Sequence, residues 1–239
     1  MYLNCILLPK DVKSIRDPQQ ITHIKKILKS KVGDSLTIGE MGGNIGKATI
    51  AQINHDEVLL TDIILDKQPP AKLDLTVVLA LPRPKVLRRL IMDMTSLGVN
   101  KLIVVNSYKS EKSYWQSPLL ERIDEFVFEG LQQAIDTVPL EVALKKRFKP
   151  FVEDEFPALL QEANSHAVIA HPYASQSWKS YLDSDESMPK VLCIGAEGGW
   201  IDYEVDLLCK HGCTSVSLGE RILRTETVVN VLLGHWLEK

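Results

Sequence analysis

The chain has 239 residues, of which 45% are hydrophobic and 25% are charged, and its formal net charge is −3 at pH 7. This composition is typical of a globular protein and excludes extended disorder and fibrous repeats. Because the charge balance is slightly acidic, any contact with RNA has to come from a local basic patch. No apolar run reaches the roughly 18 residues of a membrane span, and the N-terminus lacks the basic region of a signal peptide, so we expect a cytoplasmic protein.

The first 65 residues favour a small β-barrel, because short apolar stretches of strand length alternate with turn residues. The predicted strands are Leu3–Leu8, Ser35–Ile38, Lys47–Ile53 and Val58–Ile64. One helix interrupts them, since Asp17 can cap it and Pro18 suits its first turn. Residues 66–74 contain two prolines and several charges and predict a linker. The first domain is therefore expected over residues 1–68.

Residues 73–239 show a different pattern, in which short apolar strands alternate with amphipathic helices. This alternation predicts an α/β domain with a mainly parallel sheet and helices on both faces. The predicted strands are Thr76–Leu81, Leu102–Val105, Val142–Leu144, Ala167–Ala170, Val191–Ile194 and Ser215–Leu218. The predicted helices are Val86–Leu97, which stops at Gly98, Pro118–Ile135, Asp202–Lys210 and Thr225–Leu237.

Ligands of open α/β sheets bind beyond the carboxyl ends of the strands, and three such loops carry unusual residues. His171-Pro172 follows one strand. Gly195–Trp200 holds three glycines in five residues, which lets the backbone approach a flat ligand, although a structural turn is the alternative. Leu218–Thr227 sets two arginines and two glutamates around an apolar pair, although a solvated charged face is the alternative.

Several common sites are excluded by their missing motifs. The chain has no G-x-G-x-x-G opening a helix after a strand, no P-loop motif and no G-x-S-x-G nucleophile elbow. Cys209-x-His211-x-Cys213 lacks a second ligand pair at zinc spacing, so we expect no metal. All cysteines, including Cys5 and Cys193, are expected to be reduced.

With these residues in view, three motifs carry a family resemblance. I-G-A-E-G-G-W at 194–200 resembles I-G-P-E-G-G-[FL], L-G-E-R-I-L-R-T-E-T at 218–227 resembles L-G-x-R-I-L-R-x-E-T-A, and H-P at 171–172 also matches. Over its whole length the chain is similar to the RsmE family, the SPOUT-superfamily methyltransferases that modify N3 of a uridine in bacterial 16S ribosomal RNA.

The resemblance implies a fold, a cofactor and partners. It implies a PUA-like barrel over 1–68 that binds RNA and a SPOUT domain over 73–239 whose C-terminal part threads into a trefoil knot. The implied cofactor is S-adenosylmethionine, bound in the knot. The implied partners are ribosomal RNA or the small ribosomal subunit and a second copy of the chain in a homodimer.

The site residues follow by matching the motifs position by position. Cofactor binding falls on His171, Pro172, Gly195, Glu197, Gly198, Gly199, Leu218, Gly219, Ile222, Leu223, Arg224, Glu226 and Thr227. Because uracil N3 carries a proton, catalysis needs a group that accepts it or stabilises the resulting anion. Our hypothesis is that Arg224 or Arg221 supports the anion, while Glu226 or Glu197 orients that arginine or serves as the base.

Clusters of basic residues are the candidates for contacts with RNA phosphates, with solvated faces as the alternative for each. They are His23, Lys25, Lys26, Lys29 and Lys31, then Arg83, Lys85, Arg88 and Arg89, then Lys145, Lys146, Arg147 and Lys149.

Departures from the family pattern concern the expected substrate side. Asp93 replaces a lysine of the pattern, and Gln132–Asp136 loses an arginine and gains an acid. These changes are expected to remove positive charge from surfaces that face RNA. Two classes of function therefore stay open, namely an active RNA methyltransferase, on the usual uridine or on another RNA, and a noncatalytic RNA- or ribosome-binding relative.

Overall fold

The computed structural model describes residues 3–184 and 187–237. The predicted domain ranges 1–68 and 73–239 therefore include residues 1–2, 185–186 and 238–239, which lie outside the described part. The chain divides into two compact units. The first contains the described residues up to Lys72 together with 94–98 and 124–139, and the second contains 73–93, 99–123 and the described residues from 140 onward.

The first unit is built on a five-stranded sheet in the order β1-β3-β4-β5-β2. Its strands are β1 (Ile6–Leu8), β2 (Ser14–Ile15), β3 (Ser35–Glu40), β4 (Ile45–Ile53) and β5 (Val58–Lys67). β1 pairs with β3 in parallel and the other pairs are antiparallel. Sequence predicted four of these strands and missed the two-residue β2. The first strand begins at Ile6, later than predicted, because the backbone N–H groups of Asn4 and Cys5 donate to the Gln132 carbonyl.

Helix α1 (Pro18–Thr22) continues into a π-helical segment, His23–Leu28, that packs on this sheet. The predicted cap is confirmed, because the Asp17 carboxylate accepts a hydrogen bond of 2.8 Å from the Gln20 N–H. The buried apolar face contributes Ile21 and Ile24, which join the core of the first unit.

The second unit contains a seven-stranded sheet in the order β10-β12-β9-β11-β6-β7-β8. All of its recorded strand pairs are parallel, which confirms the predicted sheet type. The strands are β6 (Leu73–Ala80), β7 (Val99–Val105), β8 (Glu141–Lys145), β9 (Ala167–Ala170), β10 (Gln176–Ser177), β11 (Val191–Ile194) and β12 (Cys213–Ser217).

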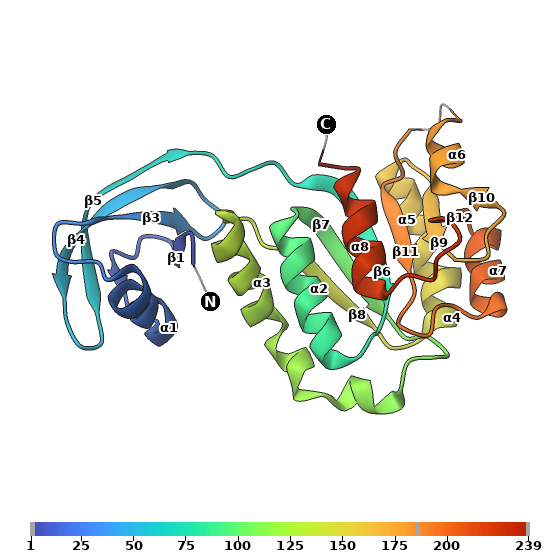
Figure 1. The fold of residues 1–239 in the computed structure, drawn as a ribbon, viewed down its shortest axis with the longest axis horizontal. Coiled ribbons are helices and arrows are strands. Elements are labelled where there is room, and N and C mark those ends of the chain that lie inside the picture. The colour runs from blue at the N-terminus through green and yellow to red at the C-terminus, as the bar shows by residue number, and fades with distance from the viewer. Residues whose placement is uncertain (1–2, 185–186, 238–239) are drawn as a thin grey trace. The chain divides into compact units, whose positions relative to one another are not determined.

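Two groups of helices cover the sheet of the second unit. α2 (Pro84–Ser96) and α8 (Thr225–Gly234) lie over one face, as Figure 1 shows. They are joined side by side by an ion pair of 3.1 Å between Arg89 and Glu226 and a hydrogen bond of 3.5 Å from Asn230 to Asp93.

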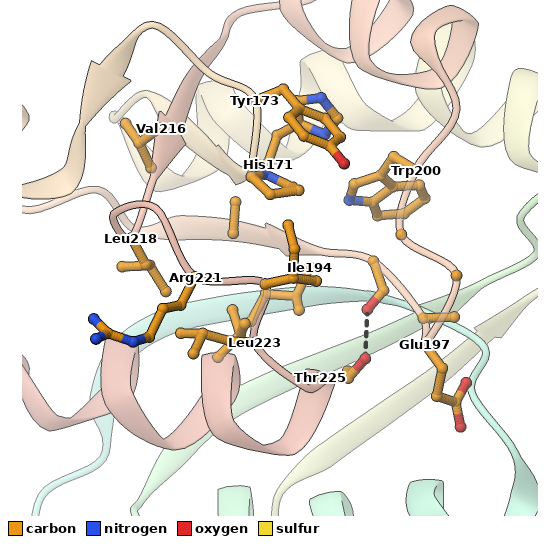
Figure 2. A pocket seen from close by; sticks show the side chains of 18 of the residues that line it. His171, Tyr173, Ile194, Glu197, Trp200, Val216, Leu218, Arg221, Leu223 and Thr225 are labelled. Carbon is orange, nitrogen blue, oxygen red and sulfur yellow. Dashed lines mark hydrogen bonds between the residues drawn. The ribbon is translucent and has the colours of Figure 1, made fainter.

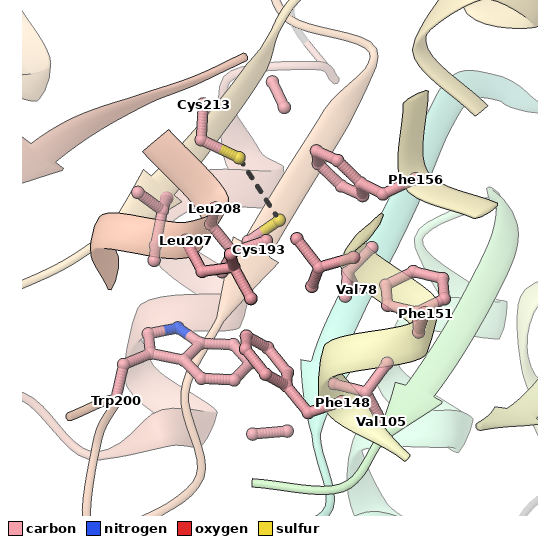
Figure 3. Packing of buried hydrophobic residues seen from close by; sticks show 14 of the residues in the cluster. Val78, Val105, Phe148, Phe151, Phe156, Cys193, Trp200, Leu207, Leu208 and Cys213 are labelled. Carbon is pink, nitrogen blue, oxygen red and sulfur yellow. Dashed lines mark hydrogen bonds between the residues drawn. The ribbon is translucent and has the colours of Figure 1, made fainter. Parts of the chain in front are cut away.

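The opposite face carries α4 (Phe148–Pro150), α5 (Phe156–Ala163) and α7 (Asp202–Lys210). Figure 3 shows the core that these helices form with the sheet, where Phe148, Phe156 and Leu208 pack against Val78 and Cys193. Since strand side chains alternate between faces, the sheet is apolar on both sides, as parallel sheets require.

Some predicted boundaries were wrong. The predicted helix Pro118–Ile135 is a 3₁₀ segment, Pro118–Arg122, followed by α3 (Ile123–Ala134). The predicted strand Ser215–Leu218 begins at Cys213 and ends at Ser217. The last helix ends at Gly234 rather than Leu237, consistent with the low helix propensity of glycine. Sequence also missed the helical segments between β8 and β9 and α6 (Trp178–Leu182).

The four cysteines are free, as predicted. The thiols of Cys193 and Cys213 lie 3.9 Å apart in the core, on strands that both pair with β9. Burial raises the pKa of Cys5 to about 12, so that thiol stays protonated. Among the described residues, no helix is long and apolar enough to cross a membrane, and no group of three metal-ligating side chains is found.

Candidate functional site

A pocket of about 220 Å³ lies at the carboxyl ends of three neighbouring strands, β9, β11 and β12. Its wall comes from the loops 170–173, 194–200 and 216–223, with the first turn of α8 closing one side. These are the three loops that the sequence singled out. Figure 2 shows side chains from all three loops converging on the same space.

The glycine-rich loop brings two backbone segments closer than any side chain would allow. A Cβ placed on Gly195 would lie 2.9 Å from the Cα of Gly199, and Gly199 itself has φ +68°. The Gly199 N–H donates to the Ala196 carbonyl over 2.8 Å, which closes the turn. The loop therefore folds tightly on itself, and only glycine fits at the position of Gly195.

One end of the pocket is apolar. Leu218 and Leu223 are half-buried there, and Ile222 beside them is 69% exposed. The segment is fixed to the neighbouring loop by the Thr225 hydroxyl, which donates to the Gly195 carbonyl over 3.3 Å. A thin apolar slot next to backbone donors and acceptors suits an aromatic heterocycle.

The other end carries polar rings. His171 is held through its backbone N–H, which donates to the Val216 carbonyl over 2.9 Å, and its ring lies 5.7 Å from that of Tyr173. Trp200 completes this end and is 4% exposed. The His171 Nδ1 and Trp200 Nε1 atoms are buried and have no hydrogen-bond partner among the described residues. Buried polar atoms are normally satisfied, so these two nitrogens are available to a ligand in the pocket.

Burial, together with two nearby charges, shifts the pKa of the imidazole. Burial lowers the pKa of His171 below its ordinary value of 6.5, the Asp202 carboxylate opposes this, and Lys109 adds to the lowering. Lys109 also donates a hydrogen bond of 2.7 Å from its Nζ to the Gly198 carbonyl. His171 is therefore neutral at pH 7, next to a cation.

The structure brings most of the predicted cofactor residues together. Those that line the pocket are His171, Pro172, Gly195, Glu197, Gly198, Gly199, Leu218, Gly219, Ile222 and Leu223. Arg224, Glu226 and Thr227 are outside its lining, at the start of α8.

The four predicted catalytic residues are placed differently from one another. Arg221 lines the pocket, whereas Arg224 occupies the position before α8. Glu226 pairs with Arg89 of α2, and Glu197 accepts from the Arg83 N–H over 3.1 Å. Both carboxylates thus have partners other than the two arginines with which the hypothesis grouped them.

Most of the predicted RNA-binding residues have exposed side chains. Lys26, Lys29, Arg83 and Lys85 are exposed. Arg88 and Arg89 are exposed on α2, and the ion pair of Arg89 leaves 64% of its side chain accessible. The exposed members of the other clusters are Lys31, Lys146, Arg147 and Lys149.

Some of the expected RNA contacts are corrected by the structure. His23 is 3% exposed, and its Nε2 accepts from the Leu3 N–H, so it belongs to the core of the first unit. The ammonium group of Lys25 is bound by the carbonyl oxygens of Asn54 and His55. Neither side chain presents a free charge to RNA.

The expected loss of RNA-facing charge at 132–136 is wrong. Gln132 is 3% exposed and accepts a hydrogen bond of 2.8 Å from the Gln20 amide. Asp136 is also 3% exposed, where it accepts from the N–H groups of Thr137 and Val138 and pairs with Lys72 over 2.7 Å. Both residues hold the first unit together from within.

The predicted site residues leave out several residues of the pocket wall, namely Lys109, Ala170, Tyr173, Ile194, Ala196, Trp200, Val216, Thr225 and Val228. Most of them adjoin predicted positions, so extending each motif to the end of its strand would have found them. Lys109 has no such signal, because it reaches the pocket from the loop after β7.

A parallel sheet with a pocket at the carboxyl ends of its strands defines an α/β ligand-binding protein. Residues 69–237 match the family described as the RNA methyltransferase domain, and residues 15–63 match the RNA methyltransferase PUA domain. Because the first match covers more than half of the chain, the protein belongs to this RNA methyltransferase family, as the resemblance to the RsmE family predicted.

Individual relatives agree with the family. The chain is 29% identical over 221 residues to the ribosomal RNA small subunit methyltransferase E of Treponema pallidum, covering 90% of this chain and 81% of that protein. Its fold is similar, with a TM-score of 0.76 in both cases, to two solved structures. One is a methyltransferase from Legionella pneumophila in complex with the cofactor SAM, at 21% identity and covering 100% of this chain and 98% of the other. The second is the ribosomal RNA small subunit methyltransferase E from Neisseria gonorrhoeae bound to S-adenosyl methionine, at 18% identity and 99% and 98% coverage.

Proposed function

We propose that this chain transfers the methyl group of S-adenosylmethionine to N3 of a uridine in 16S ribosomal RNA. The observation that carries the proposal is the pocket at the ends of β9, β11 and β12, which unites the motif residues in a protein of the RNA methyltransferase family. The names of the relatives, among them ribosomal RNA small subunit methyltransferase E, supply the ribosomal substrate.

The pocket fits this cofactor in its chemistry. Leu218 and Leu223 beside the glycine backbone suit the adenine ring, and the unpartnered nitrogens of His171 and Trp200 suit a polar group. When bound, S-adenosylmethionine would supply a methyl group on a sulfonium, which an aligned nucleophile can take while S-adenosylhomocysteine leaves. The chain's own contribution is therefore largely positioning of the two reactants.

The protein has to promote the loss of the proton from uracil N3. Of the two arginines in the hypothesis, Arg221 is the one that lines the pocket, so we assign it the stabilisation of the uracil anion. Glu226, at the start of α8 and paired with Arg89, is then the candidate base that accepts the N3 proton, and Arg224 occupies the position before that helix. Glu197, tied to the Arg83 N–H, orders the loop after β11.

RNA approaches the second unit, in this proposal, at the same edge of the sheet as the pocket. Arg83 and Lys85 are exposed just after β6, and Tyr108 and Tyr173 are each 80% exposed on the loops after β7 and β9. Cations can bind phosphates and exposed aromatic rings can stack on unpaired bases. On the first unit, residues 1–68 would form an RNA-binding PUA-like domain, with Lys26 and Lys29 as its candidate contacts.

The proposal extends to the assembly. We propose that residues 73–239 form a SPOUT domain, that its C-terminal segment is threaded as a trefoil knot, and that the protein works as a cytoplasmic homodimer without a metal. The family match over residues 69–237 supports this assignment, and the contact from Thr225 to Gly195 brings the C-terminal segment beside the loop after β11. Ile222 and Val231, exposed by 69% and 47% at the C-terminal segment, support an apolar face for the second copy.

The alternative of a noncatalytic relative loses part of its support. It rested on altered residues at 92–96 and at 132–136, and the buried contacts of Gln132 and Asp136 explain the second group by the stability of the first unit.

Arg221→Ala tests the function at the site. The wild type should transfer labelled methyl groups from S-adenosylmethionine to small ribosomal subunits taken from a strain that lacks the gene. The variant should lose about 100-fold in kcat, the typical effect of removing one anion-stabilising donor, with little change in affinity for S-adenosylhomocysteine. Arg224→Ala and Glu226→Gln, measured in the same way, show whether these two residues contribute. Unchanged turnover in all three variants would contradict the catalytic assignment.

A further inference from the structure

The indole nitrogen of Trp200 is a hydrogen-bond donor that the protein does not use. Trp200 is 4% exposed, and its ring packs against Phe148 with the centroids 5.7 Å apart (Figure 3). Its Nε1 atom is buried and unpartnered among the described residues, and Figure 2 shows the nitrogen-bearing edge turned toward His171 across the pocket. A purely apolar side chain would satisfy the packing equally well, so packing does not explain the N–H group.

The surroundings of this nitrogen favour an anionic acceptor. His171 Nδ1, the other unpartnered ring nitrogen of the pocket, becomes a second donor in the tautomer that carries its proton there. The Lys109 ammonium lies in the same wall, on the Gly198 carbonyl. Two carboxylates are near this end: that of Glu197 is turned to the Arg83 N–H, and that of Asp202 partly offsets the lowering of the His171 pKa. Donors and a positive charge therefore gather at one end, while Leu218 and Leu223 make the other end apolar.

This polarity matches the two ends of the proposed cofactor. Its adenine is flat with apolar faces, whereas its amino-acid end carries a carboxylate beside an ammonium group. The carboxylate is the only anionic group of the cofactor, and it accepts hydrogen bonds. We propose that the Trp200 indole N–H, together with His171, binds the carboxylate of the cofactor's amino-acid end and so sets the direction in which the cofactor lies. The inference rests on the proposed function, since it assumes S-adenosylmethionine in the pocket.

Binding measurements with two ligands and two proteins test the contact without relying on turnover. Calorimetry would compare S-adenosylhomocysteine with its decarboxylated analogue, which lacks only the carboxylate. We expect the wild type to bind the analogue at least ten-fold more weakly. We expect Trp200→Phe, which keeps the aromatic packing and removes the N–H, to bind S-adenosylhomocysteine about ten-fold more weakly than the wild type does and to discriminate far less between the two ligands.

Trp115 provides a matched control, because its indole N–H already donates to the Asn106 side chain over 2.8 Å and it is outside the pocket lining. Trp115→Phe should leave both affinities within about two-fold of the wild type. If Trp200→Phe loses the same factor of affinity for both ligands, or loses none, the inference is overturned and the proposed function is not affected. If that variant does not fold, wild-type protein that binds both ligands equally well overturns it as well. Wild-type protein that binds neither ligand overturns the proposed function together with the inference.

Discussion

His171 is the residue of the pocket whose protonation can be followed. Burial lowers its pKa below 6.5, while the unfolded chain keeps the ordinary value. Protonation therefore favours the unfolded state, so stability is fully present above about pH 6.5 and declines as the pH falls toward the lowered pKa. We expect His171→Asn to unfold with a weaker dependence on pH between 5 and 7 than the wild type, as measured by urea denaturation at several pH values.

Tyr173→Phe is the control for this prediction, because it keeps the imidazole and the neighbouring ring contact. Its stability should follow the pH as the wild type does. If His171→Asn shows the same slope as the wild type, then burial does not hold the imidazole neutral in the folded protein.

At this scale the motifs predicted the pocket wall well, because each motif follows a strand and the three strands are neighbours in one sheet. The motifs could not predict which residue each charged side chain pairs with. Glu226 belongs to Arg89, which is 137 residues away in sequence, and Lys109 reaches Gly198 across 89 residues. Such pairings depend on how the elements pack, and local sequence does not encode them.

At the scale of elements, Asp136 fixes the segment after α3 in the first unit. Its carboxylate holds the turn at Thr137 and Val138 and binds Lys72, whose side chain is 11% exposed. Removing one member of a buried ion pair leaves the other charge without compensation. We expect Asp136→Ala to lower the free energy of unfolding by about 3 kcal/mol, as measured by chemical denaturation.

Asp93→Ala is the comparison, because Asp93 is half-buried and, among the residues that the structure describes, accepts only a long hydrogen bond of 3.5 Å from Asn230. It should cost less than about 1 kcal/mol. Equal losses in the two variants would show that the contacts of Asp136 add nothing to the stability of the first unit.

Elements with regular patterns were predictable, and those interrupted by proline were not. The strands of the parallel sheet are short apolar runs, and the cap of α1 is a local signal in Asp17 and Pro18. The helical segments between β8 and β9 contain Pro150 and Pro157, which read as breaks in sequence, although each is tolerated near the start of a helix. Asp136 was expected at the surface, because an acidic residue in a helix-to-strand connection usually faces solvent. Its burial could not be predicted, because it depends on the distant partner Lys72.

For the whole molecule, composition and alternation gave the division into a β-rich first part and a parallel α/β second part. They did not predict that residues 94–98 and 124–139 belong to the first unit, because that grouping arises from contacts between residues distant in sequence. The order of the strands, with β9 between β12 and β11, is equally beyond periodicity. It nevertheless determines the function, because this order brings the three motif loops together.

The most direct test of the proposed function is reverse transcription across 16S ribosomal RNA. Methylation at N3 blocks the pairing edge of uracil, so reverse transcriptase stops at a modified uridine. We expect a stop in RNA from cells that carry the gene, its loss in a strain without it, and its return with the wild-type gene but not with Arg221→Ala. A stop that persists in the strain without the gene would contradict the account, because another enzyme would then make that modification.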